Sequence, residues 1–172
     1  MAAEAERFEP LAILAAFERA RVDYVLIGGV ARVLQGAEEV TYGVDLTPSL
    51  RERVLERAQA PLDSLEAEAR DRRKTPLPER VARGEEVIGY RTPLGEVQIV
   101  PTPAGTQGYE DLRRRASREY LGEGVRVQVA SINDLSRMLA AREREEDLQR
   151  LLAMRRLHEL ERSVGRGIDL GR

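Results

Sequence analysis

Apolar and polar positions alternate along the chain with two different periods, which predict helices and strands in succession. Apolar residues recur at helical spacing in six stretches: 8–20, 30–35, 50–60, 109–117, 131–142 and 143–162. Short apolar runs, rich in β-branched residues or alternating with polar ones, predict five strands: 23–27, 44–46, 86–91, 96–100 and 125–130. The fourth strand follows the third across a turn at 92–95, so these two are expected to form a hairpin.

This order of elements predicts an α/β (α+β) fold, with a small mixed β-sheet flanked by helices and a C-terminal helical pair. We expect a core at 1–130, C-terminal helices packed on that core at 131–163, and a flexible Gly-rich tail at 164–172. The stretch 70–84 combines prolines, a glycine and many charges, and it is expected to be a mobile loop. Ser49 and Ser131 each precede an acidic residue by three positions, which predicts a helix N-cap at both.

Composition excludes several classes of protein. The chain has no cysteine, which excludes disulfides, a thiol nucleophile and zinc–thiolate sites. It has no apolar run near the ~20 residues that span a bilayer, and its N-terminus lacks a signal-peptide pattern, so we expect a cytoplasmic protein with no membrane partner. A formal net charge of −2 gives no global attraction for nucleic acid. Lys74 is the only lysine beside many arginines, which suggests a GC-rich or thermophilic bacterial source.

Two neighbouring stretches carry the candidate chemistry. The apolar run 22–27 ends in Gly28-Gly29 and leads into a predicted helix, and a second strand then carries Asp45. A glycine pair lets the backbone approach a phosphate closely, and the amides that open a helix favour anions. A carboxylate on the adjacent strand is a suitable ligand for Mg²⁺. The pattern therefore points to a site that handles phosphate and metal.

These stretches resemble the opening of the DNA polymerase-β-like nucleotidyltransferase superfamily, and within it the small bacterial branch of AbiEii-type toxins and minimal nucleotidyltransferases. The resemblance extends over roughly residues 8–160 and implies a nucleotidyltransferase fold. It also implies transfer of a nucleoside monophosphate from a nucleoside triphosphate to a hydroxyl group, with Mg²⁺ as cofactor. In that family a glycine pair is followed by Asp-x-Asp, and here the second Asp is Asp45.

Three positions depart from the family pattern. Gly43 stands where the first Asp is expected, and Gln98 stands in the strand that usually supplies a third carboxylate. Leu139 occupies the place of a lysine, whereas Arg144 and Asp147 match. Each missing carboxylate removes roughly 4 kcal/mol of attraction for a charge ~4 Å away at an effective dielectric of ~20. Mg²⁺ is therefore expected to bind weakly, if it binds at all.

The prediction that follows is a nucleotidyltransferase-fold protein that is catalytically degenerate and keeps a cleft for a nucleotide or a partner. Asp45 is expected to be the remnant catalytic residue and a weak metal ligand. The expected nucleotide-binding residues are Gly28, Gly29, Gln98 and Arg144.

Two alternatives remain open, and with them the question of whether the chain is an enzyme. Glu96 lies two residues before Gln98 and hence on the same strand face, so Asp45 and Glu96 could form an irregular metal site in an active nucleotidyltransferase. The chain could also be a toxin–antitoxin-like interaction module with a protein partner. The acceptor, which could be RNA, and the oligomeric state are not specified by the sequence. His158, the only histidine, lies away from every motif and is expected to be structural.

Overall fold

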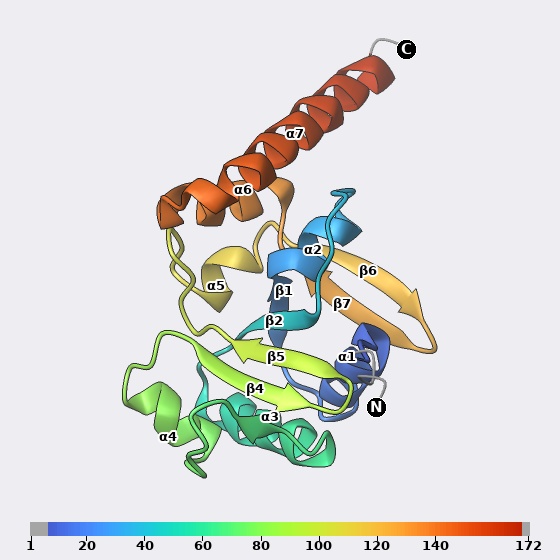
Figure 1. Cartoon of the computed structure of the whole chain (residues 1–172). Helices are drawn as coiled ribbons and strands as arrows, with labels where there is room; N and C mark the ends of the chain where they lie inside the picture. Colours follow the sequence, from blue (N-terminus) through green and yellow to red (C-terminus); the bar gives the residue numbers. More distant parts are fainter. Residues whose placement is uncertain (1–6, 170–172) are drawn as a thin grey trace, which may run out of the picture.

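A seven-stranded mixed β-sheet forms the centre of the computed structural model, which describes residues 7–169 and the side chains of 7–165 (Figure 1). The strand order is β3-β4-β5-β2-β1-β7-β6. Strands β2 and β5 are parallel, as are β1 and β7, and all other neighbours are antiparallel. The strands are β1 (Tyr24–Ile27), β2 (Gly43–Pro48), β3 (Glu68–Ala69), β4 (Ile88–Thr92), β5 (Gly95–Ile99), β6 (Ser117–Gly122) and β7 (Val125–Val129).

Helices surround this sheet, and the last two form the predicted C-terminal pair (Figure 1). The helices are α1 (Pro10–Arg19), α2 (Gly28–Leu34), α3 (Glu52–Ser64), α4 (Leu77–Ala82), α5 (Tyr109–Leu112), α6 (Ile132–Arg142) and α7 (Leu148–Asp169). Helix α2 packs on β1, β2 and α6, whereas α1 packs on β7 and α3. The predicted class, a mixed sheet flanked by helices with a C-terminal helical pair, is confirmed.

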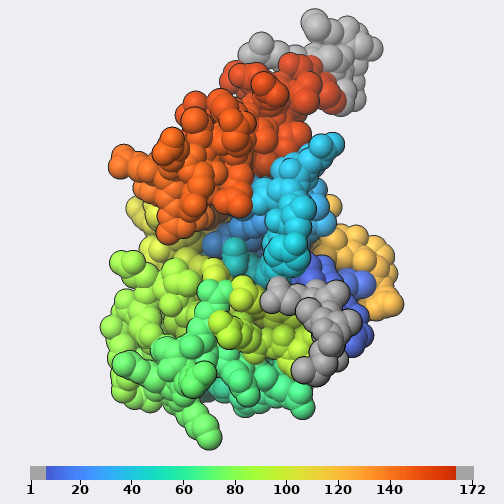
Figure 2. Space-filling view, viewed as in Figure 1, coloured from blue at the N-terminus to red at the C-terminus, as the bar shows by residue number. Residues whose placement is uncertain are grey.

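The core is built from the apolar stripes that the sequence pattern shows. All four residues of β1 are buried, because this strand lies between β2 and β7 with helices packed on it. Helix α1 contributes Ile13, Leu14 and Phe17, all fully buried. Helix α7 attaches to the core through Met154, which is fully buried, and then runs beyond the body of the molecule (Figure 2). None of the helices in the described part of the chain is sufficiently long and apolar to cross a membrane.

The stretch 70–84, expected to be a mobile loop, contains helix α4 instead. Pro76 precedes this helix and Pro78 lies in its first turn, where proline is well tolerated. Leu77 is fully buried and anchors the helix to the core. Arg80 is also buried, and it pairs with two carboxylates from the same segment. The charges that suggested a loop therefore form a local network that orders it.

The predicted helix 109–117 was also wrong in part. Helix α5 ends at Leu112, and the residues from Ser117 to Gly122 form β6, which pairs with β7. The residues between α5 and β6 form a turn in place of the predicted last helical turn. Helix α3 begins at Glu52 without the side-chain cap expected from Ser49, whereas the cap at Ser131 is confirmed by a 3.0 Å hydrogen bond from the Asp134 amide.

Helix α7 continues to Asp169, seven positions past the expected end at 162. The flexible tail predicted at 164–172 thus begins inside a helix, and its last three residues lie outside the described part of the chain. A turn with a short 3₁₀ helix (Glu145–Asp147) separates α6 from α7, where a continuous helix was expected from 143. Glu143 has a left-handed backbone conformation (φ 50°), which ends α6 and lets the chain change direction.

Replacement of Asp134 by alanine is expected to lower the free energy of unfolding by about 3 kcal/mol, measured by urea denaturation. The Asp134 carboxylate is 1% exposed and accepts three hydrogen bonds of 3.0–3.2 Å from Arg115, so its loss removes a buried acceptor and leaves Arg115 paired with Asp111 alone. Glu110→Ala serves as the control, because Glu110 forms an exposed pair with Arg113 and should change stability by less than about 1 kcal/mol. Equal effects of the two substitutions would contradict this assignment.

Candidate functional site

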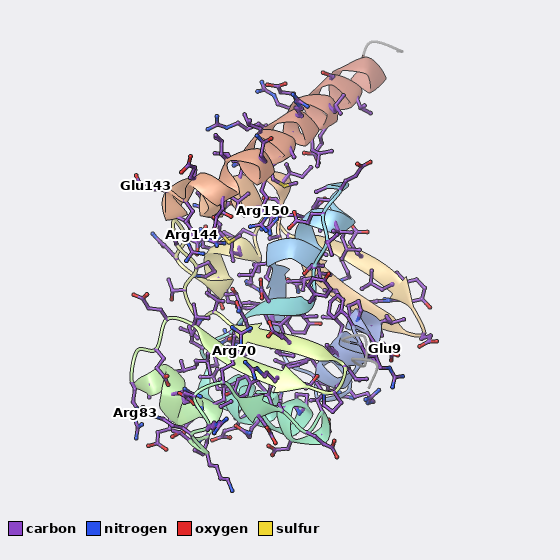
Figure 3. The ribbon with its side chains drawn as sticks, viewed as in Figure 1. Glu9, Arg70, Arg83, Glu143, Arg144 and Arg150 are labelled. Atoms are coloured by element: carbon purple, nitrogen blue, oxygen red, sulfur yellow. The ribbon has the colours of Figure 1, made fainter. Side chains whose placement is uncertain are left out.

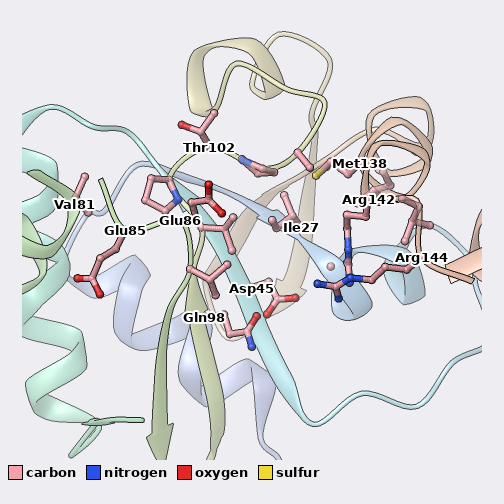
Figure 4. Close-up of a pocket in the computed structure, with 18 of the residues that line it drawn as sticks. Ile27, Asp45, Val81, Glu85, Glu86, Gln98, Thr102, Met138, Arg142 and Arg144 are labelled. Atoms are coloured by element: carbon pink, nitrogen blue, oxygen red, sulfur yellow. The ribbon is translucent and has the colours of Figure 1, made fainter. Parts of the chain in front are cut away.

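A cleft of about 750 Å³ lies between the central sheet and the α6–α7 turn (Figure 4). Its walls come from the β1–α2 junction, the middle of β2, β5 with the following segment 100–104, the segment 81–87, and α6 with the start of the turn. Four of the predicted site residues line it: Gly28, Asp45, Gln98 and Arg144. The motif residues, which are far apart in the sequence, are thus brought to one place.

Asp45 and Gln98 are register partners on the parallel strands β2 and β5, and their side chains lie side by side at the floor of the cleft (Figure 4). Gly43 is the partner of Glu96 two positions earlier. Glu96 therefore lies beside Gly43, the position where the sequence resemblance would place the first Asp. Glu96 pairs with Arg70, however, and does not line the cleft.

The backbone of Gly28 lies directly against the side chain of Asp45. Its φ of +72° favours glycine, and a Cβ atom at this position would lie 2.0 Å from Oδ2 of Asp45. Gly29 faces another way, since a Cβ atom there would meet the Thr41 hydroxyl at 2.9 Å. The first glycine therefore makes room for the Asp45 carboxylate, and the second gives close packing against the segment before β2. Only the first lines the cleft.

The Asp45 carboxylate accepts no hydrogen bond from the described residues, and its side chain is half-buried at the floor of the cleft. Burial raises its pKa to about 6, because the charged form loses hydration. Arg32, Arg142 and Arg70 oppose this shift, and Glu96 adds to it. Asp45 is thus an under-stabilised carboxylate that faces the cleft.

Arg142 and Arg144 extend from the end of α6 and the following turn toward Asp45 (Figure 4). Arg144 pairs only loosely with Glu146, at 3.8 Å, and both side chains are more than half exposed. Arg142 lies 3.3 Å from Asp147, and burial lowers its guanidinium pKa from the ordinary value. Arg142 remains protonated at neutral pH all the same. The cleft therefore has a cationic end beside its one deeply placed carboxylate.

Sequence reasoning identified Arg144 but did not assign Arg142 or Arg32 to the site. Arg32 lines the cleft from α2 and is held by Glu39 through two hydrogen bonds of 2.8 Å. The helical periodicity of α6 does place Arg142 one turn after Met138, on the cleft side, and this signal could have identified it. Leu139, where the sequence resemblance would place a lysine, lines the cleft as an apolar residue.

The carboxylates present do not fit a two-metal site. In the part of the chain that the structure describes, no three His, Cys, Asp or Glu side chains come together in a way that could hold a metal ion. Asp45 has a neutral amide beside it in place of a second carboxylate, and cationic side chains face it. A divalent cation here would meet less negative charge than its usual oxygen ligands supply.

The chain matches no family model and no curated protein. Among solved structures it is similar to the antibiotic-resistance factor ANT(2'')-Ia, an aminoglycoside nucleotidyltransferase whose solution structure shows substrate-regulated conformation dynamics. The TM-score is 0.54 with 14% identity, over 93% of this chain and 92% of that one. At this low sequence identity, the similarity between the two structures supports a shared fold and nothing more. The chain has a nucleotidyltransferase-type fold.

Proposed function

We propose that the chain is a catalytically degenerate relative of the AbiEii-type and minimal nucleotidyltransferases, and that its cleft binds a nucleotide through arginine side chains without a divalent metal. The observation that carries the proposal is the placement of Arg142 and Arg144 beside Asp45 and Gln98. The family resemblance implies that metal-bound phosphates lie in this part of the fold.

The charges favour direct recognition of phosphate. A guanidinium group binds phosphate oxygens through two parallel N–H donors and keeps its charge at any physiological pH. Arg144 forms only a long, exposed contact with a carboxylate, so it can bind a ligand with little loss of other contacts. Arg142 contributes a second cation from the same turn. Together they supply positive charge that a bound metal would otherwise provide.

The rest of the cleft suits a nucleoside. Away from the arginines the lining residues include the apolar side chains of Val87, Val100, Pro101, Pro103 and Met138, together with the carboxylates of Glu85 and Glu86. The cleft volume of about 750 Å³ falls within the ~300–1,000 Å³ typical of small-molecule sites. A nucleotide could place its flat base against these side chains and its phosphates beside Arg142 and Arg144.

Isothermal titration with ATP, CTP, GTP and UTP in EDTA tests this proposal. We expect binding of at least one nucleotide, with an affinity that millimolar Mg²⁺ does not increase. Arg144→Ala should weaken that binding about tenfold, because one charged hydrogen bond to phosphate is lost. Arg156→Ala is the matched control: it removes the same charge from an exposed position on α7 outside the cleft and should leave the affinity unchanged.

Transfer assays with labelled nucleotides address the lost chemistry. The native chain should be inactive with Mg²⁺ or Mn²⁺. Transfer by the native chain that Asp45→Ala abolishes would contradict the proposal, and Glu96→Gln would then show whether Glu96 completes an irregular site. The restored variant Gly43→Asp/Gln98→Asp tests whether the scaffold is competent, although a Cβ atom at Gly43 would lie 3.1 Å from the Cβ atom of Glu96.

A further inference from the structure

The α6–α7 turn connects the cationic end of the cleft to helix α7. Arg142 is the last residue of α6 and lines the cleft. Asp147 is the last residue of the 3₁₀ helix immediately before α7. Glu143 and Arg144 lie at the corner between them, on the outer end of the helical pair (Figure 3). A ligand that contacts the end of α6 is therefore only a few residues from the first turn of α7.

A chain of alternating charges runs from this turn to α2. Asp147 accepts a 2.9 Å hydrogen bond from Arg150, whose Nε lies 3.6 Å from Glu39, and Glu39 accepts two bonds of 2.8 Å from Arg32. The carboxylates are well buried, with side-chain exposures of 2% for Asp147 and 13% for Glu39. Arg150 lies between α7 and α2 (Figure 3). This chain of ion pairs holds the start of α7 against the core.

A further ion pair joins Arg142 to Asp147 without a hydrogen bond, as is also the case for Arg150 and Glu39. Oδ2 of Asp147 is fully buried and accepts no hydrogen bond from any described residue, although Nε of Arg142 is 3.3 Å away. A buried acceptor without an aligned donor is costly, so a shift that aligns this pair is favourable. The terminal N–H groups of Arg142 are separate donors and remain free for a ligand in the cleft.

We propose that Asp147 is a positioning residue that couples occupation of the cleft to the docking of α7. A phosphate that binds the terminal N–H groups of Arg142 orients its guanidinium, and Nε then completes the hydrogen bond to Asp147. The new hydrogen bond strengthens the chain of ion pairs that runs through Arg150 to Glu39, and it fixes α7 on the core. Coupling of this kind is reciprocal, so docked α7 in turn favours the phosphate-bound cleft. The inference rests on the proposed binding of a nucleotide.

Hydrogen exchange of the amides in 148–160 tests the coupling in the full chain. A saturating mixture of ATP, CTP, GTP and UTP in EDTA should slow their exchange about fivefold, the lower end of usual couplings between sites. Asp147→Asn should abolish this slowing. Glu146→Gln is the matched control: it removes an exposed carboxylate from the same turn and should preserve the slowing.

Arg142→Gln keeps the test valid if Asp147→Asn unfolds α7, because it leaves the pairs from Asp147 to Arg32 in place. At a saturating nucleotide concentration it should bind without slowing exchange in α7. Nucleotide binding to the native chain without any change in 148–160 would overturn the coupling and leave the proposed function intact. Absence of binding by titration would overturn the proposed function and the coupling together.

Discussion

Asp45→Asn is expected to raise the free energy of unfolding by about 2 kcal/mol at pH 8 and to lose this advantage toward pH 4. The pKa of Asp45 is raised by burial from 3.8 to about 6, so the folded state binds its proton more tightly than the unfolded state does. The stability associated with the protonated carboxyl is fully present below pH 3.8 and is lost as pH rises through 6. A full shift of this size corresponds to about 3 kcal/mol, and the remaining exposure of Asp45 to the cleft reduces it.

The measurement is urea denaturation of the native chain and the variants from pH 2 to pH 8, in buffers without phosphate, since phosphate is expected to bind in the cleft. The difference between the two proteins isolates Asp45 from other titrating groups. Asp111→Asn is a control of opposite sign. Its carboxyl pKa is lowered to about 2 by the Gln107 amide and by Arg115, so this variant should be less stable than the native chain at pH 7 and should approach it only as the pH falls from 3.8 through 2. A pH-independent difference for Asp45→Asn would contradict the assignment.

The expected gain from Asp45→Asn also bears on function. An ionised carboxylate without a hydrogen-bond donor opposes folding at neutral pH, and an apolar or neutral residue would serve the fold better. Groups of this kind are typical of binding and catalytic sites, where stability is sacrificed for chemistry. Together with the arginines that face it, Asp45 therefore supports a cleft that still has a ligand, even though the carboxylates for two metal ions are missing.

The local pattern of the chain predicted the centre of the fold well. The buried run before Gly28, the short helix after it and the strand with Asp45 are all present, because each is set by neighbouring residues. The family resemblance implied that Gln98 lies on a strand next to that of Asp45, and the register of the parallel strands β2 and β5 makes the two residues partners. Four of the six expected site residues consequently line one cleft.

Other features depend on contacts between distant segments and could not be predicted locally. The edge strand β6 is polar on one face and acquires its structure by pairing with β7. The sequence pattern placed the break between the two C-terminal helices at 142/143, but it did not predict the turn itself, with its left-handed Glu143 and its 3₁₀ helix. Arg142 enters the site because this turn packs over the sheet. Glu96 does not line the cleft and pairs with Arg70, which comes from a distant segment.

Gly28→Ala is expected to lower the free energy of unfolding by about 3 kcal/mol or more. Two costs combine at this position. An alanine with φ near +72° is strained by about 1–2 kcal/mol. In addition, the new Cβ atom would lie 2.0 Å from Oδ2 of Asp45 and 2.8 Å from its Cγ, so the carboxylate must leave its place. Urea denaturation at pH 7 measures the sum.

Gly84→Ala separates the two costs, because Gly84 has a similar φ of +79° and no atom within 4 Å of an added Cβ. It should lose only the conformational part, about 1–2 kcal/mol. Combining Gly28→Ala with Asp45→Ala should recover most of the remainder, since only the Cβ atom of residue 45, at 3.0 Å, stays close. If Gly28→Ala cost no more than Gly84→Ala, or if the double variant recovered nothing, the Asp45 carboxylate would not lie against Gly28. The floor of the proposed nucleotide cleft would then need a different arrangement.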